Sequence, residues 1–345
     1  MKTQSCMNRL LWITLLVIGL SGCSEESSSS EENTESGTIQ DGDHTDNATV
    51  IQLNSSDQYQ TVEGIGGGIA NYENWYCQHP NKKELFDLIF KDLEISMIRI
   101  GNWYEKKISG ENPDILKQQK EIMDAATQRL GRSNFSVMMS NWLVAPDLID
   151  RPKEKGATLK RNNEGKYMYK EFGEWCRMTL KAYQEADMSP DYLSMMNEPD
   201  GDNSAGTKIR LGYGIDDSQK ANYGKALDAT YEAFKEVSKR PKLIGPEVLG
   251  IGYGTFSNYY RDLNPDLLDA AAFHCYHGGK TSDYKDNDRY SSAHAFKTEF
   301  QNIVRQVGNE RNLYFRNLVG RVCYETKLYN RNLESVYFPV YFCQW

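Results

Sequence analysis

The sequence predicts a barrel of alternating parallel β-strands and α-helices, a (β/α)8 TIM-type fold. Strand-like and helix-like segments alternate from residue 49 to the end of the 345-residue chain, which is the pattern of a parallel sheet. About seven strand–helix steps favour a barrel over a doubly wound sheet. The glycines of residues 64–68 lack the spacing and the following helix of a nucleotide-binding loop.

The N-terminus predicts an export signal. Two basic residues precede an apolar run from Leu10 to Leu20, which is shorter than a membrane-spanning helix and typical of a signal peptide. The run ends in Leu20-Ser21-Gly22-Cys23, which resembles the bacterial lipobox, where the cysteine is lipidated. We therefore expect residues 1–22 to be a lipoprotein signal peptide, with a membrane anchor at Cys23 and an outer-membrane location on the periplasmic or cell-surface face. An ordinary secretory signal with a chance cysteine is the alternative.

Residues 23–48 predict a disordered tether, because they are rich in Ser, Glu, Asp, Thr and Gly and offer little to bury. The folded part then spans residues 49–345. The formal net charge is −8, and loss of the signal peptide would make it two units more negative. An acidic chain is not expected to bind nucleic acid or anionic lipid through charge, so a neutral or weakly charged partner fits better.

The predicted strands are short apolar runs, several of which lead into polar residues. In chain order they are Thr49–Leu53, Val62–Ala70, Ser96–Ile100, Phe135–Ser140, Tyr192–Met196, Lys242–Glu247, Ala270–His274 and Leu318–Tyr324. Helices are expected where apolar residues recur at helical spacing, at Lys82–Leu93, Asp114–Leu130, Tyr169–Ala186, Ser218–Ser238, Phe256–Leu263 and Ser291–Val307.

Glu198 is the leading candidate for a general acid/base. It stands in Asn197-Glu198-Pro199, directly after an apolar run, so the proline ends the strand and leaves the carboxylate at the mouth of the barrel. Side chains at that mouth carry the chemistry of such barrels. Hydrolysis of a glycosidic bond needs one carboxylic acid that protonates the leaving oxygen and then deprotonates water. A helix-capping or ion-paired glutamate is the alternative.

Glu325 is the candidate nucleophile, because it follows the run Leu318–Tyr324. A nucleophilic carboxylate must stay ionised, which requires a nearby cation and hydrogen-bond donors. Arg99 and Tyr276, both at predicted strand ends, could supply them. The competing Glu299 lies inside an amphipathic helix and is expected to face solvent.

Further polar and aromatic residues at strand ends suggest a sugar site. Asn197 could hydrogen-bond a sugar 2-hydroxyl, a bond that strengthens in the transition state; a strand-end cap is its alternative. Aromatic rings can stack on the apolar faces of sugars, and Trp142 and Trp103 are the best candidates for such a platform. Packing in the core is the alternative for each ring singly.

No metal or other cofactor is expected. His274 and His277 have a His-x-x-His spacing, but they lie at a strand end rather than on a helix, and no acidic partner completes a site. The cysteines after Cys23 are odd in number and contain no Cys-x-x-Cys, which indicates neither a zinc site nor a disulfide framework: Cys77, Cys176, Cys275, Cys323 and Cys343.

These residues resemble glycoside hydrolase family 30 of clan A, which includes glucuronoxylanases, β-1,6-glucanases and glucosylceramidases. The motifs that carry the resemblance are Gln60-Thr61-Val62-Glu63-Gly64-Ile65-Gly66-Gly67, the strand of Arg99, Ser140-Asn141-Trp142, Asn197-Glu198-Pro199-Asp200 and His274-Cys275-Tyr276.

The resemblance covers roughly residues 49–328. It implies a retaining, endo-acting hydrolase of O-glycosyl bonds, working by double displacement on a β-linked polysaccharide such as xylan or glucuronoxylan. Glu198 would be the acid/base and Glu325 the nucleophile, with His274 among the substrate-binding residues. The family also implies a β-sandwich side domain, of which Thr49–Leu53 would be a remnant.

Two features depart from the family pattern. Tyr324 precedes Glu325, where family members often have threonine. The chain also ends at Trp345, whereas a parallel crossover alone takes about a dozen residues. We therefore expect the eighth strand–helix unit and most of the side domain to be absent, as in a C-terminally truncated chain.

Two functions from different classes remain open. One is the glycoside hydrolase, which the pair of strand-end glutamates favours. The other is a surface glycan-binding lipoprotein, or a catalytically inactive remnant, which the missing eighth unit favours. A metal-dependent esterase is a distant third, and insensitivity to a chelator would exclude it.

Overall fold

The computed structural model describes residues 64–152, 154–201, 209–214, 219–250, 254–274, 293–308, 312–316 and 340–343. The chain divides into Met1–Asp57, none of which is described, and Gln58–Trp345, which contains every described residue. The predicted signal peptide, the anchor at Cys23, the tether and the strand Thr49–Leu53 therefore lie outside the described residues. So do Tyr276 and Glu325.

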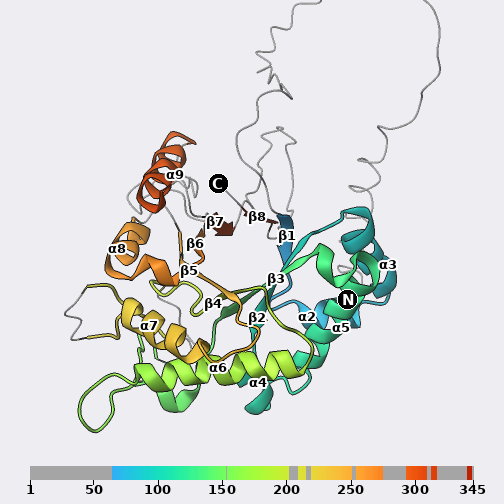
Figure 1. The fold of residues 1–345 in the computed structure, drawn as a ribbon. Helices are drawn as coiled ribbons and strands as arrows, with labels where there is room; N and C mark the ends of the chain where they lie inside the picture. Colours follow the sequence, from blue (N-terminus) through green and yellow to red (C-terminus); the bar gives the residue numbers. More distant parts are fainter. Residues whose placement is uncertain are drawn as a thin grey trace, which may run out of the picture. The chain divides into compact units, whose positions relative to one another are not determined.

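Seven parallel strands form a curled sheet in which each strand pairs with the next along the chain. They are β1 (Gly64–Gly68), β2 (Met97–Asn102), β3 (Ser136–Asn141), β4 (Tyr192–Ser194), β5 (Lys242–Val248), β6 (Ala270–His274) and β7 (Asn312–Arg316). Helices lie outside the strands in Figure 1. The predicted parallel strand–helix architecture is confirmed for these strands.

An eighth strand occupies the position where the sequence predicts none. Residues Val340–Cys343 form β8, which pairs antiparallel with both β7 and β1, so the strand order β1 to β8 closes on itself. The expectation of an absent eighth strand is therefore wrong, although the strand found is antiparallel rather than part of a parallel strand–helix unit. Its Val-Tyr-Phe-Cys sequence suits a strand, and it pairs the otherwise open edges of β1 and β7.

The seventh strand also differs from the prediction. The sequence favours Leu318–Tyr324, which would lead directly into Glu325, but β7 is Asn312–Arg316. Its Leu-Tyr-Phe run pairs residue by residue with β6, so Arg316 lies opposite His274. The run Leu318–Tyr324 lies outside the described residues.

The main helices bury one face each against the sheet or a neighbouring helix. They are α2 (Glu73–Gln78), α3 (Lys82–Asp87), α4 (Tyr104–Ile108), α5 (Ile115–Leu130), α6 (Tyr169–Glu185), α7 (Tyr223–Phe234), α8 (Thr255–Asp262) and α9 (Ala293–Val307). The π-helix η1 (Leu88–Asp92) follows α3, and short 3-10 turns cover Arg132–Asn134, Pro146–Leu148 and Pro265–Leu267. No helix in the described part of the chain is long and apolar enough to cross a membrane.

Helix α7 begins five residues later than the sequence suggests. The side chain of Asn222 accepts a hydrogen bond from the backbone N–H of Lys225 at 2.9 Å, which caps the helix at that point. An asparagine in this position satisfies one of the N–H groups that the first helical turn leaves without a partner.

The interior of the curled sheet is filled by an apolar layer near the starts of the strands. One side chain from each of five strands, with a second from β6, makes this cluster: Met97, Met138, Tyr192, Ile244, Ala270 and Ala272. A much larger apolar cluster lies between the strands and the helices. Because side chains alternate along a strand, the residue two positions after each interior residue also points inward, one layer closer to the strand ends.

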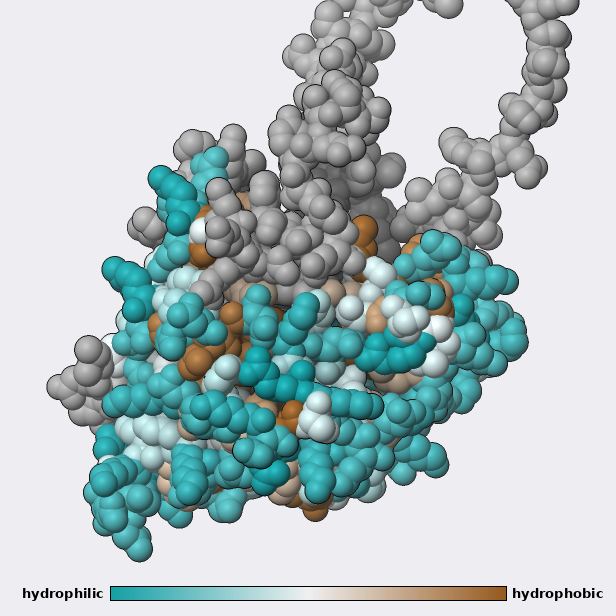
Figure 2. Space-filling model, viewed as in Figure 1, coloured by the Kyte–Doolittle hydropathy of each residue, from teal (hydrophilic) through white to brown (hydrophobic). Residues whose placement is uncertain are grey.

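Strand β1 approaches β2 closely because it is built from glycine. A Cβ atom on Gly66 would lie 2.0 Å from the carbonyl oxygen of Met97, a distance no side chain can tolerate. The face of the molecule in Figure 2 is mostly hydrophilic, with separate hydrophobic patches. Large apolar side chains that are exposed in the described part include Ile65 and Leu93.

Candidate active site

A polar layer replaces the apolar one at the carboxyl ends of the strands. Arg99 follows Met97 by two residues on β2, Ser140 follows Met138 on β3, and His274 follows Ala272 on β6. All three are fully buried. The strand period therefore places a guanidinium, a hydroxyl and an imidazole in the same layer of the barrel, next to the apolar layer.

Glu247 is the centre of this layer, and the sequence analysis missed it. A single carboxylate oxygen, Oε1, accepts hydrogen bonds from Arg99 Nη2 at 2.5 Å and from Ser140 Oγ at 3.1 Å, and lies 3.2 Å from His274 Nε2. Burial opposes ionisation of this side chain, but the Arg99 guanidinium and the His274 ring outweigh it and lower the pKa of Glu247 to about 2. Glu247 is therefore a fixed anion.

A bulge turns the Glu247 side chain inward. The pairing of β5 with β6 shifts register between Pro246 and Val248, and Glu247 lies between them with a φ of 54°. Bulges of this kind re-aim a side chain and are common beside active sites. Glu198, at the end of the adjacent strand, also has a positive φ, of 50°. A left-handed backbone conformation costs about 1–3 kcal/mol at each non-glycine residue, and residues in this conformation are concentrated at functional sites.

Glu198 occupies the open side of the buried layer, as the sequence predicts. Its side chain is 13% exposed, whereas those of His274 and Glu247 are 0% and 1% exposed. Glu198 Oε1 lies 2.8 Å from His274 Nδ1. The imidazole thus lies between two carboxylates, one fixed and buried and one at the mouth, and Glu198 can meet a ligand from outside.

Asn197 is held beneath this mouth. Its Oδ1 accepts a hydrogen bond from Arg99 Nη2 at 2.6 Å, and its backbone N–H donates to the carbonyl of Asn141 at 2.8 Å. Because the side-chain oxygen is occupied by Arg99, the amide NH2 is the part of Asn197 that can address a ligand hydroxyl.

The two predicted tryptophans are stacked, but only one can face a ligand. Their ring centroids are 5.2 Å apart, with planes 29° from parallel. The Arg99 guanidinium lies 4.1 Å from the centroid of Trp142, which is partly exposed. Trp103 is only 2% exposed and supports Trp142 from beneath, so its predicted role as a sugar platform does not fit the burial.

A buried acid holds Trp103 in place. Glu73 Oε1 accepts hydrogen bonds from the Trp103 indole at 2.6 Å and from the Gln119 amide at 3.1 Å. Burial raises the pKa of Glu73, and these hydrogen bonds only partly offset it. Gly101 completes the support, because a Cβ atom there would lie 2.3 Å from the Trp103 ring.

The loops after β4 and β5 are joined by Asp200. Its Oδ1 accepts from the backbone N–H of Leu249 at 2.8 Å, and its Oδ2 accepts from the hydroxyl of Thr255 at 2.5 Å. This carboxylate therefore connects the segment that carries Glu198 to the segment after Glu247 and to the start of α8.

The structure brings Arg99, Asn197, Glu198 and His274 together and adds Glu247 and Ser140. The proposed partner carboxylate Glu325 and the donor Tyr276 lie outside the described residues. In the sequence, Glu325 comes nine residues after Arg316, the last residue of β7. In the described part of the chain, no group of three or more His, Cys, Asp or Glu side chains is arranged to hold a metal ion.

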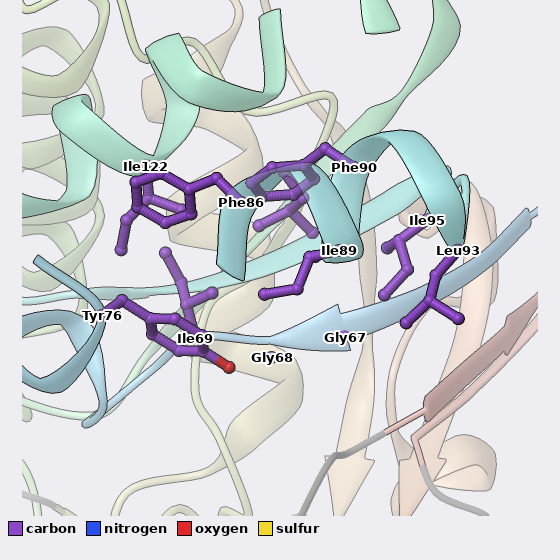
Figure 3. Close-up of a pocket in the computed structure, with 11 residues that line it drawn as sticks. Gly67, Gly68, Ile69, Tyr76, Phe86, Ile89, Phe90, Leu93, Ile95 and Ile122 are labelled. Atoms are coloured by element: carbon purple, nitrogen blue, oxygen red, sulfur yellow. The ribbon is translucent and has the colours of Figure 1, made fainter. Parts of the chain in front are cut away.

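Two hollows lie away from this layer. Figure 3 shows one of about 40 Å³ between β1 and η1, where Gly67 and Gly68 of β1 form one wall and apolar side chains of η1 lie on the other side. Its lining is apolar apart from the Tyr76 hydroxyl and includes Ile69, Ile89, Phe90 and Ile98. A larger one of about 750 Å³ touches Ser136, Tyr192 and Lys242 at the starts of β3, β4 and β5, the end opposite Glu198.

No protein-family model and no curated protein matches the sequence. Among solved structures, an endo-β-1,6-glucanase is similar with a TM-score of 0.51 and 15% identity, over 76% of this chain and 58% of that one. A conserved exported protein from Bacteroides fragilis gives 0.50 and 14%, over 74% and 61%. A glycoside hydrolase family 30 subfamily 8 xylanase from Clostridium acetobutylicum gives 0.44 and 15%, over 65% and 52%.

The chain thus spans between about half and three-fifths of the length of these solved structures. The matching structures include family 30 xylanases and an endo-β-1,6-glucanase, and the chain has a fold like that of the endo-β-1,6-glucanase. At these identities the likeness concerns the fold alone.

Proposed function

We propose that the protein is a retaining β-glycoside hydrolase that acts on a β-linked polysaccharide, with Glu198 as general acid/base. The observation that carries the proposal is the position of Glu198, a partly exposed carboxyl group at the mouth of a layer of buried charged groups. Polysaccharide-degrading enzymes among the structures of similar fold support the substrate class.

The site suits the first half of a double displacement. Glu198 would give its proton to the glycosidic oxygen as the bond to the anomeric carbon breaks, so the leaving sugar departs as an alcohol. The Asn197 amide would donate to the 2-hydroxyl, and the exposed face of Trp142 would stack on a sugar ring. Positive charge develops on the sugar in the transition state. Asn197 and Trp142, which Arg99 already holds in place, would then lie beside that charge.

The proposed nucleophile is Glu325, which would attack the anomeric carbon and form the covalent glycosyl-enzyme. Water would then release the sugar, with Glu198 acting as base for that water. The pair of carboxyl groups would have to lie about 5–5.5 Å apart for this retaining mechanism.

The second candidate function, a glycan-binding protein without turnover, is favoured by one observation. The eighth position of the sheet is filled by the antiparallel strand β8 (Val340–Cys343) instead of a parallel strand of the kind that forms a (β/α)8 barrel. In this case Trp142 and Asn197 would bind glycan, but no strand-end nucleophile would complete the reaction.

One experiment separates the two candidates. The full chain is incubated with xylan, glucuronoxylan, β-1,6-glucan and β-1,6-galactan, and reducing-sugar release is measured beside Glu198→Gln, Glu325→Gln and the exposed control Glu171→Gln. Release by the parent and the control, with loss in the two site variants, supports the hydrolase. Binding of a glycan by all four proteins, without release by any, supports the binding protein.

The lipid anchor at Cys23 is proposed on the sequence motif alone. A lipid anchor there would hold the proposed hydrolase at the outer membrane, on its periplasmic or cell-surface face. Cys23→Ser should abolish labelling by a fatty acid and move the protein from the membrane fraction to the soluble fraction. Unchanged labelling would reject Cys23 as the lipid site.

A further inference from the structure

The acid/base candidate Glu198 begins a tight turn that follows β4 and ends at Gly201. The carbonyl oxygen of Glu198 accepts a hydrogen bond from the backbone N–H of Gly201 at 2.9 Å. Pro199 occupies the second position of this turn, where the fixed φ of a proline is favourable. Glu198 itself has a φ of 50°, and a residue in such a conformation keeps it only where the surroundings hold it.

The side chain of Asp200 connects this turn to the loop after β5 and to α8. Its Oδ1 accepts a hydrogen bond from the backbone N–H of Leu249 at 2.8 Å, and its Oδ2 accepts one from the hydroxyl of Thr255, the first residue of α8, at 2.5 Å. The N-cap residue of α8 is Gly254, which has no side chain to cap the helix. A carboxylate from another segment therefore lies at the N-terminus of α8, where the helix dipole favours negative charge.

Helix α8 gives the turn a firm support. Phe256 is buried and packs edge-to-face against Phe273 of β6, with ring centroids 5.8 Å apart. The hydroxyl of Tyr259 donates to the carbonyl oxygen of Leu211 at 2.5 Å, and the N–H of Leu211 donates to the carbonyl oxygen of Pro199 at 3.1 Å. The helix therefore reaches the turn by a second route besides the carboxylate.

Resting on the proposed function, we infer that Asp200 is a positioning residue for the acid/base Glu198. Its carboxylate acts through the turn, which it holds against α8 and against the loop after β5. Proton transfer to the leaving oxygen requires the acid within hydrogen-bond reach, and a misplacement of about 1 Å can cost about 10²-fold in rate. Loss of this carboxylate should therefore impair the acid step more than the binding of the sugar.

The structural part of the inference can be measured without activity. Hydrogen exchange of the full chain is followed by mass spectrometry in peptides that contain the amides of Glu198, Gly201 and Leu249. Asp200→Ala should speed exchange at these amides by about tenfold or more, because the hydrogen bonds that protect them open more often. Unchanged exchange would overturn the inference, whether or not the protein hydrolyses glycan.

Asp150 offers a matched control for this measurement. Its Oδ1 also accepts two hydrogen bonds within a loop, from the backbone N–H groups of Arg151 and Thr158, at 2.8 Å each. Asp150→Ala should therefore loosen the loop after β3 and leave exchange in the Glu198 turn unchanged. Equal exchange in the Glu198 turn for Asp150→Ala and Asp200→Ala would show a general loss of stability and reject the specific role of Asp200.

Kinetics then test the positioning role. Values of kcat and KM are measured on the polymer that the glycan panel identifies and on a 2,4-dinitrophenyl glycoside, whose leaving group needs no protonation. Asp200→Ala should lose about 10–10²-fold more in kcat/KM on the polymer than on the activated glycoside, with the polymer loss in kcat rather than KM. Asp150→Ala should leave the ratio between the two substrates unchanged.

A conservative variant separates the hydrogen bonds from the folding of the chain. Asn in place of Asp200 can accept from the Leu249 N–H through its oxygen and can donate to the Thr255 hydroxyl through its amide. Asp200→Asn should therefore recover most of the polymer activity that Asp200→Ala loses. Near-UV circular dichroism checks that all variants fold.

An equal loss on both substrates, or full polymer activity in Asp200→Ala, would reject the positioning role. Absence of hydrolysis of either substrate by the parent rejects the proposed function, and the acid/base role with it, while hydrogen exchange still decides whether Asp200 holds the turn. The two failures are therefore distinguishable.

Discussion

Glu198 and Glu247 are joined through their backbones as well as through His274. The N–H of Glu198 donates to the carbonyl oxygen of Glu247 at 2.9 Å, and both residues have φ in the left-handed region. Two adjacent strand ends thus hold each other in a conformation that neither residue would favour alone. This backbone link keeps Glu198, the partly exposed acid, in register with Glu247, the buried anion that contacts the same His274 ring.

Removal of the buried cation Arg99 should strongly destabilise the protein. Arg99→Met would leave Glu247 buried and without its cation, and breaking a buried ion pair from one side costs about 3–5 kcal/mol. Urea unfolding measures this loss against Lys83→Met, which breaks an exposed pair with Asp87 and should cost much less, because solvent screens that pair. Equal effects of the two substitutions would show that the buried pair is unimportant for stability.

The stability that Glu247 contributes should depend on pH in a defined direction. Its pKa falls from 4.5 to about 2 on folding, so the folded state prefers the ionised form. The contribution is complete above pH 4.5 and is lost as pH falls towards about 2. The destabilisation caused by Glu247→Gln should therefore shrink between pH 6 and pH 3 in urea unfolding. A difference that stays constant or grows on acidification contradicts this account.

The contribution of Glu73 to stability should change with pH in the direction opposite to that of Glu247. Burial raises its pKa, so the folded state prefers the protonated acid, and the carboxylate carries a penalty that is relieved as pH falls. Gln can accept the same bonds from Trp103 and Gln119 without a charge. We expect Glu73→Gln to leave stability at pH 7 unchanged or higher. A loss above about 1 kcal/mol would mean that the charge itself holds Trp103.

The stacked rings of Trp103 and Trp142 should be displaced by one methyl group added at Gly101. Gly101→Ala would push against the Trp103 ring, and overpacking of this kind costs about 1–3 kcal/mol. Displacement of Trp103 should also weaken glycan binding through Trp142, which isothermal titration and near-UV circular dichroism would detect. Gly110→Ala is the control, since its Cβ would meet nothing within 4 Å, although its φ of 80° adds strain. Identical spectra for parent and Gly101→Ala would refute the supporting role of Trp103.

Site residues at the ends of strands could be predicted from the sequence, because the two-residue period of a strand determines which side chains point inward. The end of the apolar run shows where the strand ends. Arg99 and His274 both follow apolar residues at strand spacing, and Glu198 stands before a proline that ends its strand. Glu247 shows the same signal, an acid after the apolar run Leu243–Pro246. The predicted strand Lys242–Glu247 ends on this residue, but the bulge that turns Glu247 inward is not visible in a sequence pattern.

The remaining differences come from contacts between distant segments. Trp103 is buried because Trp142 and Glu73, from other elements, cover it, and no local pattern contains that information. Strand β8 exists through pairing with β1 and β7, with Cys343 opposite both Gly64 and Tyr314. Its Val-Tyr-Phe-Cys sequence alone identifies neither the partner strands nor the direction of pairing.

Chemical rescue tests the central claim, that Glu198 is the acid/base of a retaining glycosidase. Glu198→Gln and the parent are assayed on 2,4-dinitrophenyl glycosides of the polymer that the panel identifies, with and without azide. The account predicts that the variant loses about 10²–10⁴-fold on the polymer, keeps glycosylation by the activated substrate, and forms a β-glycosyl azide when azide is present. Unchanged polymer hydrolysis by the variant, or an α-glycosyl azide product, would contradict it.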